Sequence, residues 1–157
     1  MADNNPNVPV SRLRYPTDYN LKSIVLYSPL IGGQLDLKSR LVELNYFEDI
    51  YSQAISGQLV ISDAVGILNL AGMNGTEFIK IVLQKSGDTE TVIDRNFRVF
   101  SVSDRSVNIS NNFESYTINF CSEEMLLGQQ YRISKSYVGQ SISDIITDIT
   151  TNFLKIT

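Results

Sequence analysis

The chain has 157 residues, of which 43% are hydrophobic and 19% charged, enough for one folded domain with a real core. Its net charge of −4 disfavours nucleic acid as the main partner, because phosphate recognition needs clustered Lys and Arg. With no His and one Cys, Ser-His-Asp and Cys-His catalysis, His metal sites and an intramolecular disulfide are excluded. No apolar run approaches the ~20 residues of a membrane-spanning helix. We therefore expect no membrane partner, and a soluble, cytoplasmic protein or one that is assembled in a cytoplasm.

The first third of the sequence predicts an arm followed by strands. Residues 1–20 hold three of the four prolines and are predicted to be a flexible arm. Residues 21–27 (LKSIVLY) are rich in β-formers and predict a strand. Residues 36–50 fit either a helix or a strand by their apolar spacing. We favour a strand, because strand-like segments follow without a break.

The middle of the chain alternates apolar and polar residues. This alternation predicts four further strands, at 55–63, 77–85, 96–105 and 113–123. Turns are expected at 86–90 and 110–112, and a short helical turn or loop at 64–72. About six strands at such regular spacing predict a mainly β fold, an antiparallel β-barrel or sandwich with short helices.

The last third predicts helices. Residues 122–130 form a helical turn with Ser122 as its possible N-cap, and 132–139 are extended. In the helix that follows, Ser141 is the expected N-cap, and Asp144 three residues later approximates a capping box. The apolar residues of this helix fall on one stripe, made by Ile142, Ile145, Ile146, Ile149 and Phe153.

An amphipathic stripe must be buried against something. We therefore expect either that this chain is a piece of a longer protein, which we favour, or that the helix docks back on the barrel. The predicted organisation is an arm at 1–20, a β-barrel domain at 21–134, and a linker and helix at 135–157 that begin a second part.

The carboxylates do not predict an active site. Glu48 and Asp49 are adjacent, and neighbours in a strand point to opposite faces, so they do not form a catalytic pair. Asp63 is placed to cap the turn at Val65 or Gly66. Cys121 is expected to be a small, half-buried core residue. We therefore predict no enzymatic activity, no cofactor and no metal.

Three sequence blocks occur in order along most of the chain. The first is FEDIYSQAISGQLVISD, the second is NGTEFIKI with an extra Thr between Gly and Glu, and the third is YVGQSISDII. In this order, over about residues 40–150, the chain resembles the N-terminal part of baseplate (tail) hub proteins of contractile-tailed bacteriophages. The matching residues are Glu48, Asp49, Ile50, Ser52, Gly57, Asp63, Gly75, Glu77, Ile81, Tyr137, Gly139, Ser141, Ile142, Asp144, Ile145 and Ile146.

The resemblance implies a structural role in the virion. Hubs of this family are longer trimers whose two tube-like β-barrel domains per chain build a pseudo-sixfold ring. That ring joins the tail tube protein to the spike protein and surrounds the channel through which the tape-measure protein and DNA pass, so DNA is only passing cargo. The implied location is the tail baseplate, assembled in the host cytoplasm.

The resemblance also directs attention to the segment 48–57. Loops that leave a barrel often carry interfaces, so we expect subunit contacts there, at Glu48, Asp49, Ile50, Tyr51, Ser52 and Gly57. The main alternative is a hexameric tail tube or tube-initiator protein with the same barrel. A carboxylate-based hydrolase, such as a cell-wall-cleaving domain, and a β-domain that binds one protein partner are further alternatives.

Overall fold

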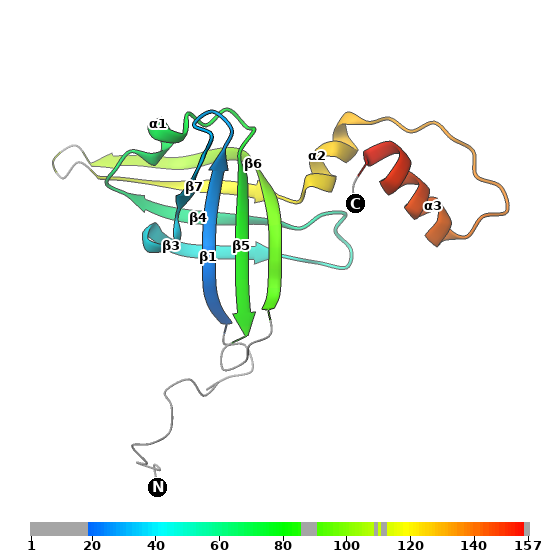
Figure 1. The fold of residues 1–157 in the computed structure, drawn as a ribbon, viewed down its shortest axis with the longest axis horizontal. Helices are drawn as coiled ribbons and strands as arrows, with labels where there is room; N and C mark the ends of the chain where they lie inside the picture. The colour runs from blue at the N-terminus through cyan, green and yellow to red at the C-terminus, as the bar shows by residue number, and fades with distance from the viewer. Residues whose placement is uncertain (1–18, 86–90, 109, 111–112, 156–157) are drawn as a thin grey trace, which may run out of the picture.

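The computed structural model describes residues 19–85, 91–108, 110 and 113–155 (Figure 1). Within these residues one antiparallel sheet of seven strands, in the order β2-β1-β5-β6-β7-β4-β3, curls into a half-barrel. The mainly β fold with short helices is therefore confirmed. The strands are β1 (Tyr19–Ser28), β2 (Gly33–Asp36), β3 (Leu41–Phe47), β4 (Ser56–Asp63), β5 (Phe78–Lys85), β6 (Thr91–Asn108) and β7 (Phe113–Cys121).

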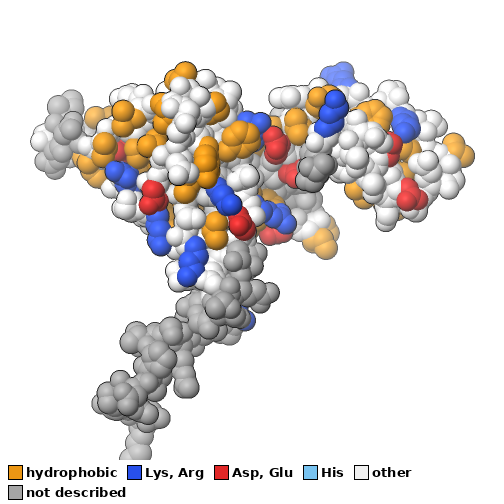
Figure 2. Space-filling model, viewed as in Figure 1, with side chains coloured by type: hydrophobic (Ala, Val, Ile, Leu, Met, Phe, Trp, Pro, Cys, Tyr) orange, Lys and Arg blue, Asp and Glu red, His pale blue; other side chains and the backbone are white. Residues whose placement is uncertain are grey.

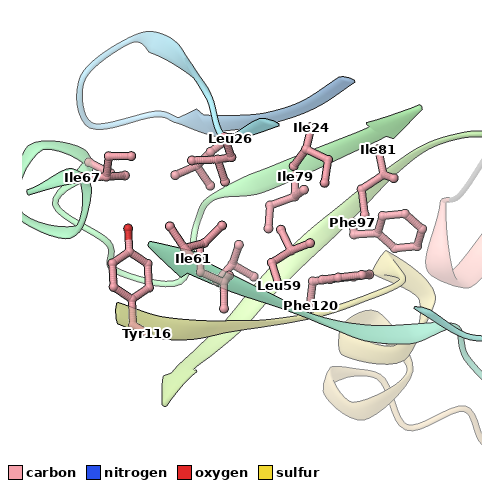
Figure 3. Packing of buried hydrophobic residues seen from close by; sticks show 14 residues of the cluster. Ile24, Leu26, Leu59, Ile61, Ile67, Ile79, Ile81, Phe97, Tyr116 and Phe120 are labelled. Carbon is pink, nitrogen blue, oxygen red and sulfur yellow. The ribbon is translucent and has the colours of Figure 1, made fainter. Parts of the chain in front are cut away.

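The core lies on the concave face of the half-barrel. In the central strands β4, β5 and β7 the buried residues fall mainly at every second position, as the alternation in the sequence predicted, and β7 also buries Thr117 and Cys121 on its other face. Figure 3 shows these side chains pointing toward one another from strands on both sides of the curl. The buried apolar cluster consists of Ile24, Leu26, Leu37, Leu59, Ile61, Ile67, Ala71, Ile79, Ile81, Phe97, Val99, Tyr116, Ile118 and Phe120.

Strand β6 produces much of the curl. Its first half pairs with β5, and from Arg98 onward it pairs with β7. The register with β7 shifts between Val99 and Ser101 and again between Ser103 and Ser106, where Asp104 has a φ of 53°. Each shift is a β-bulge, which bends and twists the strand that carries it. The predicted strand at 96–105 was therefore correct but too short. The predicted turn at 86–90 lies outside the described residues, as do residues 111–112 of the next turn.

The ambiguous segment 36–50 is divided between three elements. It contains the end of β2, a single 3₁₀ turn η1 (Lys38–Arg40) and β3. The Asp36 carboxylate accepts a hydrogen bond from the Lys38 N–H at 2.8 Å, which ends β2 and starts η1. The strand prediction is thus confirmed for 36 and 41–47. It is wrong for 37–40, where the Asp36 hydrogen bond favours a 3₁₀ turn, and for 48–50, which lie in the loop after β3.

A short helix, α1 (Ile67–Ala71), covers one end of the sheet. The Asp63 carboxylate accepts hydrogen bonds from the N–H groups of Val65, Gly66 and Ile67 at 2.8, 3.1 and 2.5 Å. The expected capping role of Asp63 is therefore confirmed. At the C-terminal end of the helix, the Ser28 hydroxyl donates a hydrogen bond to the Ala71 carbonyl at 2.7 Å and so connects α1 to β1.

The C-terminal helices are α2 (Glu123–Gln130), α3 (Ile142–Asp148) and the π-helical η3 (Ile149–Leu154). Ser141 caps α3 as predicted, because its hydroxyl accepts the Asp144 N–H at 3.2 Å. Ser122 stands at the N-cap of α2 as predicted, but within the described residues its side chain makes no capping bond. The single predicted helix changes to π-form after Asp148, where the Thr150 hydroxyl donates to carbonyls of the preceding turn.

The apolar stripe of α3 is not buried in this chain. None of the described residues of α3 and η3 is buried, and Ile142 and Ile146 are 77% and 55% exposed. Figure 1 shows the helix beside α2 and to one side of the sheet, not across it. The stripe therefore contributes little to the core of the half-barrel.

Candidate functional site

The segment singled out by the sequence forms the loop between β3 and β4, residues 48–55. The Asp49 carboxylate accepts a hydrogen bond from the Tyr51 N–H at 2.9 Å, and the Asp49 carbonyl accepts one from the Ser52 N–H at 3.0 Å. The Ser52 hydroxyl donates to the Ala54 carbonyl at 2.7 Å. These bonds within the loop hold it in one turn conformation.

This turn exposes two large apolar side chains next to each other. Ile50 is 92% exposed and Tyr51 is 93% exposed. Figure 2 shows hydrophobic side chains projecting where the β3–β4 loop lies. Single exposed apolar residues are common, but an adjacent pair on an internally bonded turn is a feature of contact surfaces. We call Ile50 and Tyr51 the apolar tip of the loop.

The structure brings five of the six predicted interface residues together and separates the sixth. Glu48 to Ser52 are all exposed on the loop. Gly57 instead lies buried inside β4, opposite Tyr46 of β3 and Phe120 of β7. A Cβ at position 57 would collide with the Phe120 ring and with the Asn45 carbonyl. Gly57 therefore acts within the sheet, by allowing the close approach of its neighbours.

The residue that precedes α2 is hydrogen-bonded to the end of the loop. The Ser122 N–H donates to the Ile55 carbonyl at 2.8 Å. Between the two segments lies a hollow of about 230 Å³, lined in part by the charged side chains of Glu48, Asp49, Arg95 and Glu124. The three carboxylates and one guanidinium give this hollow a negative balance.

An apolar groove of about 690 Å³ lies beside the loop. It is lined by the start of β1, the C-terminal half of β3, the C-terminal part of β5 and the N-terminal part of β6. The sequence reasoning missed it, although the alternation of Leu44 and Tyr46 in β3 was a signal. Burial, the Glu48 charge and the hydrogen bond to Glu48 raise the pKa of the Tyr46 hydroxyl, against the opposing effect of Arg95. Tyr46 is therefore a neutral hydrogen-bond donor at physiological pH. The apolar residues of the groove are Tyr19, Leu44, Tyr46, Phe47, Leu83 and Ile93.

The buried carboxylates serve local structure. Asp63 caps α1 and also accepts a hydrogen bond from the Tyr116 hydroxyl at 3.2 Å. Burial, followed by the charge of Asp63, raises the pKa of that hydroxyl. Glu77 accepts hydrogen bonds from the N–H groups of Asn74 and Gly75 at 3.0 and 2.8 Å, which closes the turn before β5.

The thiol of Cys121 is also a core group. It is a core residue as predicted, but it is fully buried at the end of β7 where we expected a half-buried position. Burial and the Glu124 charge raise the pKa of this thiol, which disfavours the nucleophilic thiolate. Over the described part of the chain, no group of three or more His, Cys, Asp or Glu side chains is placed to hold a metal ion. Nor does any helix in the described segments have the length and apolar character to cross a membrane.

No protein-family model matches the chain, and no curated protein matches it at a significant level.

Proposed function

We propose that this chain is a structural subunit of a phage tail baseplate hub and associates with copies of itself through the β3–β4 loop. The observation that carries the proposal is the apolar tip, Ile50 and Tyr51, held exposed on an internally bonded turn. The order of the three sequence blocks supports the hub family, and the curled antiparallel sheet is compatible with a tube-like domain.

The shape of the sheet also favours association. β2 and β3 are the edge strands, and each pairs on one side only among the described strands. An open edge presents unpaired N–H and C=O groups, which a neighbouring subunit can satisfy. In the proposed role the ring connects the tail tube protein to the spike and encloses the channel for the tape-measure protein and DNA.

The test is the mass of the purified chain in solution, measured by light scattering over a range of concentrations. The trimer is expected for the full-length form, so for this chain we expect weak association, and we expect the double variant Ile50→Ser, Tyr51→Ser to be monomeric at concentrations where the wild type associates. Val138→Ser is the matched control, because Val138 is also strongly exposed but lies outside the sheet and the loop.

The outcomes separate the alternatives. A stable hexamer that the double variant disrupts would favour the tail tube or tube-initiator protein. A monomer at every concentration, or association that the double variant leaves unchanged, would contradict self-association through this loop.

A further inference from the structure

The apolar groove beside the β3–β4 loop leaves part of the core uncovered. Leu44, Tyr46 and Leu83 line it, and the same three side chains pack against the buried apolar cluster. All three are only half-buried, and Tyr19 at the rim is 57% exposed. A segment whose apolar side chains filled this groove would remove that surface from water, which favours its binding.

The wall of the groove that β3 forms is an open sheet edge. Among the described strands β3 pairs with β4 alone, so one row of its N–H and C=O groups has no partner in the sheet. Leu44 and Tyr46 face the core from this strand, whereas Glu43 and Asn45 lie on its outer face. An extended segment beside β3 would therefore meet apolar side chains on one face and polar side chains on the other.

The charge around the groove is negative. Glu48 lies in its wall and accepts a hydrogen bond from the Tyr46 hydroxyl at 3.3 Å. None of the ion pairs within the described ranges includes Glu43 or Glu48. Arg95 lines the neighbouring hollow, but three carboxylates outnumber it there. The groove therefore favours an occupant that carries positive charge.

The N-terminal arm enters the described structure at this groove. Tyr19, the first described residue and the start of β1, is itself a lining residue. Tyr15 comes four residues earlier, so the chain places it at most about 14 Å from Tyr19. Pro16 disfavours helical geometry at Tyr15 and favours an extended backbone. The residues just before β1 are therefore within reach of the groove and suited to a strand.

The sequence of this part of the arm matches the groove. Residues 12–15 read RLRY, so in an extended chain Leu13 and Tyr15 share one face and Arg12 and Arg14 share the other. The stretch 8–16 contains these two arginines and no acidic residue. One face suits the apolar wall of the groove, and the other suits the carboxylates at the β3 edge.

We propose that residues 12–15 of the arm lie in the groove of their own chain as a short strand beside β3. Leu13 and Tyr15 cover Leu44 and Tyr46, and the two arginines face the carboxylates at the β3 edge. The arm thus covers the part of the core that the groove leaves open. The apolar tip of the loop and the β2 edge stay free, so the proposal does not depend on the proposed hub function.

The experiment is NMR of the full chain with a nitroxide spin label on Ser11→Cys, since the native Cys121 is fully buried. The label broadens the amide signals of residues that lie near it. We expect the signals of Asn45 and Phe47 to be at least twofold broader than after reduction of the label. Leu70 should not change, because Figure 1 places α1 at the other end of the sheet from the start of β1. Equal line widths of Asn45 and Phe47 before and after reduction would overturn the proposal.

A mixed sample identifies the chain that supplies the arm. Spin-labelled chains without ¹⁵N are combined with ¹⁵N-labelled chains that carry no spin label, so that only contacts between chains broaden the observed signals. We expect no broadening of Asn45 and Phe47 in this sample. Broadening there would mean that the arm of a neighbouring copy fills the groove, and it would overturn the proposal.

Two variants of the spin-labelled chain test the contacts themselves. Leu13→Ser with Tyr15→Ser removes the apolar face of the stretch, so we expect the broadening at β3 to fall at least twofold. Asn4→Ser with Asn5→Ser changes the polar start of the arm, and this matched control should keep the broadening in full. Broadening that survives the first pair of substitutions would show that the arm lies near the groove without binding in it, which would overturn the proposal.

Discussion

The half-barrel and the C-terminal segment are stabilised in different ways. The half-barrel buries a continuous cluster of apolar side chains between its curled strands. In the C-terminal segment, residues 123–155, none of the described side chains of the helices is buried. Polar and charged side chains connect that segment to the half-barrel. The Arg98 guanidinium lies 3.6 Å from the centre of the Phe78 ring and bonds Glu123 of α2 at 2.9 Å.

Within the C-terminal segment, one carboxylate makes most of the connections. Asp148 of α3 accepts hydrogen bonds from Lys135 Nζ at 2.7 Å, from the Tyr137 hydroxyl at 2.6 Å and from the Asn152 amide at 2.8 Å. These bonds connect the extended stretch before α3 to the helix. The comparison teaches that apolar residues in a helix stripe stabilise a fold only where the chain supplies a surface to cover them.

The largest expected difference between the two regions comes from shortening an isoleucine in each. Ile118→Ala removes a fully buried side chain of β7, and we expect it to lower the free energy of unfolding by about 3–4 kcal/mol. Ile146→Ala in α3 should change it by less than about 0.5 kcal/mol, because that side chain is mostly exposed. Urea unfolding followed by circular dichroism measures both. Equal losses would mean that the stripe of α3 is buried after all.

Substituting one glycine in each region tests how closely the backbone is packed in the half-barrel and in the C-terminal segment. Gly57→Ala should destabilise the half-barrel by roughly 2 kcal/mol, since the new methyl group collides with Phe120 and Asn45. Gly128→Ala in α2 meets nothing within 4 Å and should stabilise the helix by about 0.5–1 kcal/mol. Thermal unfolding of the two variants compares them directly. A neutral Gly57→Ala would contradict the close packing of β3, β4 and β7.

The smallest expected effect concerns acid. The hydrogen bonds from Lys135, Tyr137 and Asn152 lower the pKa of Asp148 to about 2, and the bond to Asp148 raises the pKa of Tyr137 to about 12. Because the folded pKa of Asp148 is below its unfolded value of about 3.9, its stabilising effect is complete above that value and is lost as the pH falls through about 2. An NMR titration of the Asp148 carboxyl carbon should give a midpoint near 2. A midpoint near 4 would show that the extended stretch is not tied to α3.

The local features of the fold were predictable where one short-range effect dominates. The alternation in 77–85 and 113–123 identified β5 and β7 and their inward faces, and the spacing from Asp63 to Val65 identified the cap of α1. The cap at Ser141 was predictable for the same reason, because its hydrogen bond joins two residues only three positions apart. The N-cap position of Ser122 was also predictable, although its side chain makes no bond to the described residues of α2.

The candidate site was only partly predictable. The loop at 48–52 was found because it follows a strand and matches a family block. Its exposed tip depends on the Asp49 and Ser52 hydrogen bonds, which the sequence permits but does not require.

By itself, the sequence determined that this protein is mainly β, because period-two alternation fixes which side chains share a face. It also determined the capping roles of Asp63 and Ser141, because such bonds span only a few residues. Only the tertiary structure decided that the sheet stops at a half-barrel, that Gly57 lies inside it and that no residue of the α3 stripe becomes fully buried. These features depend on contacts between residues far apart in the chain, and pairing register and bulges set those contacts.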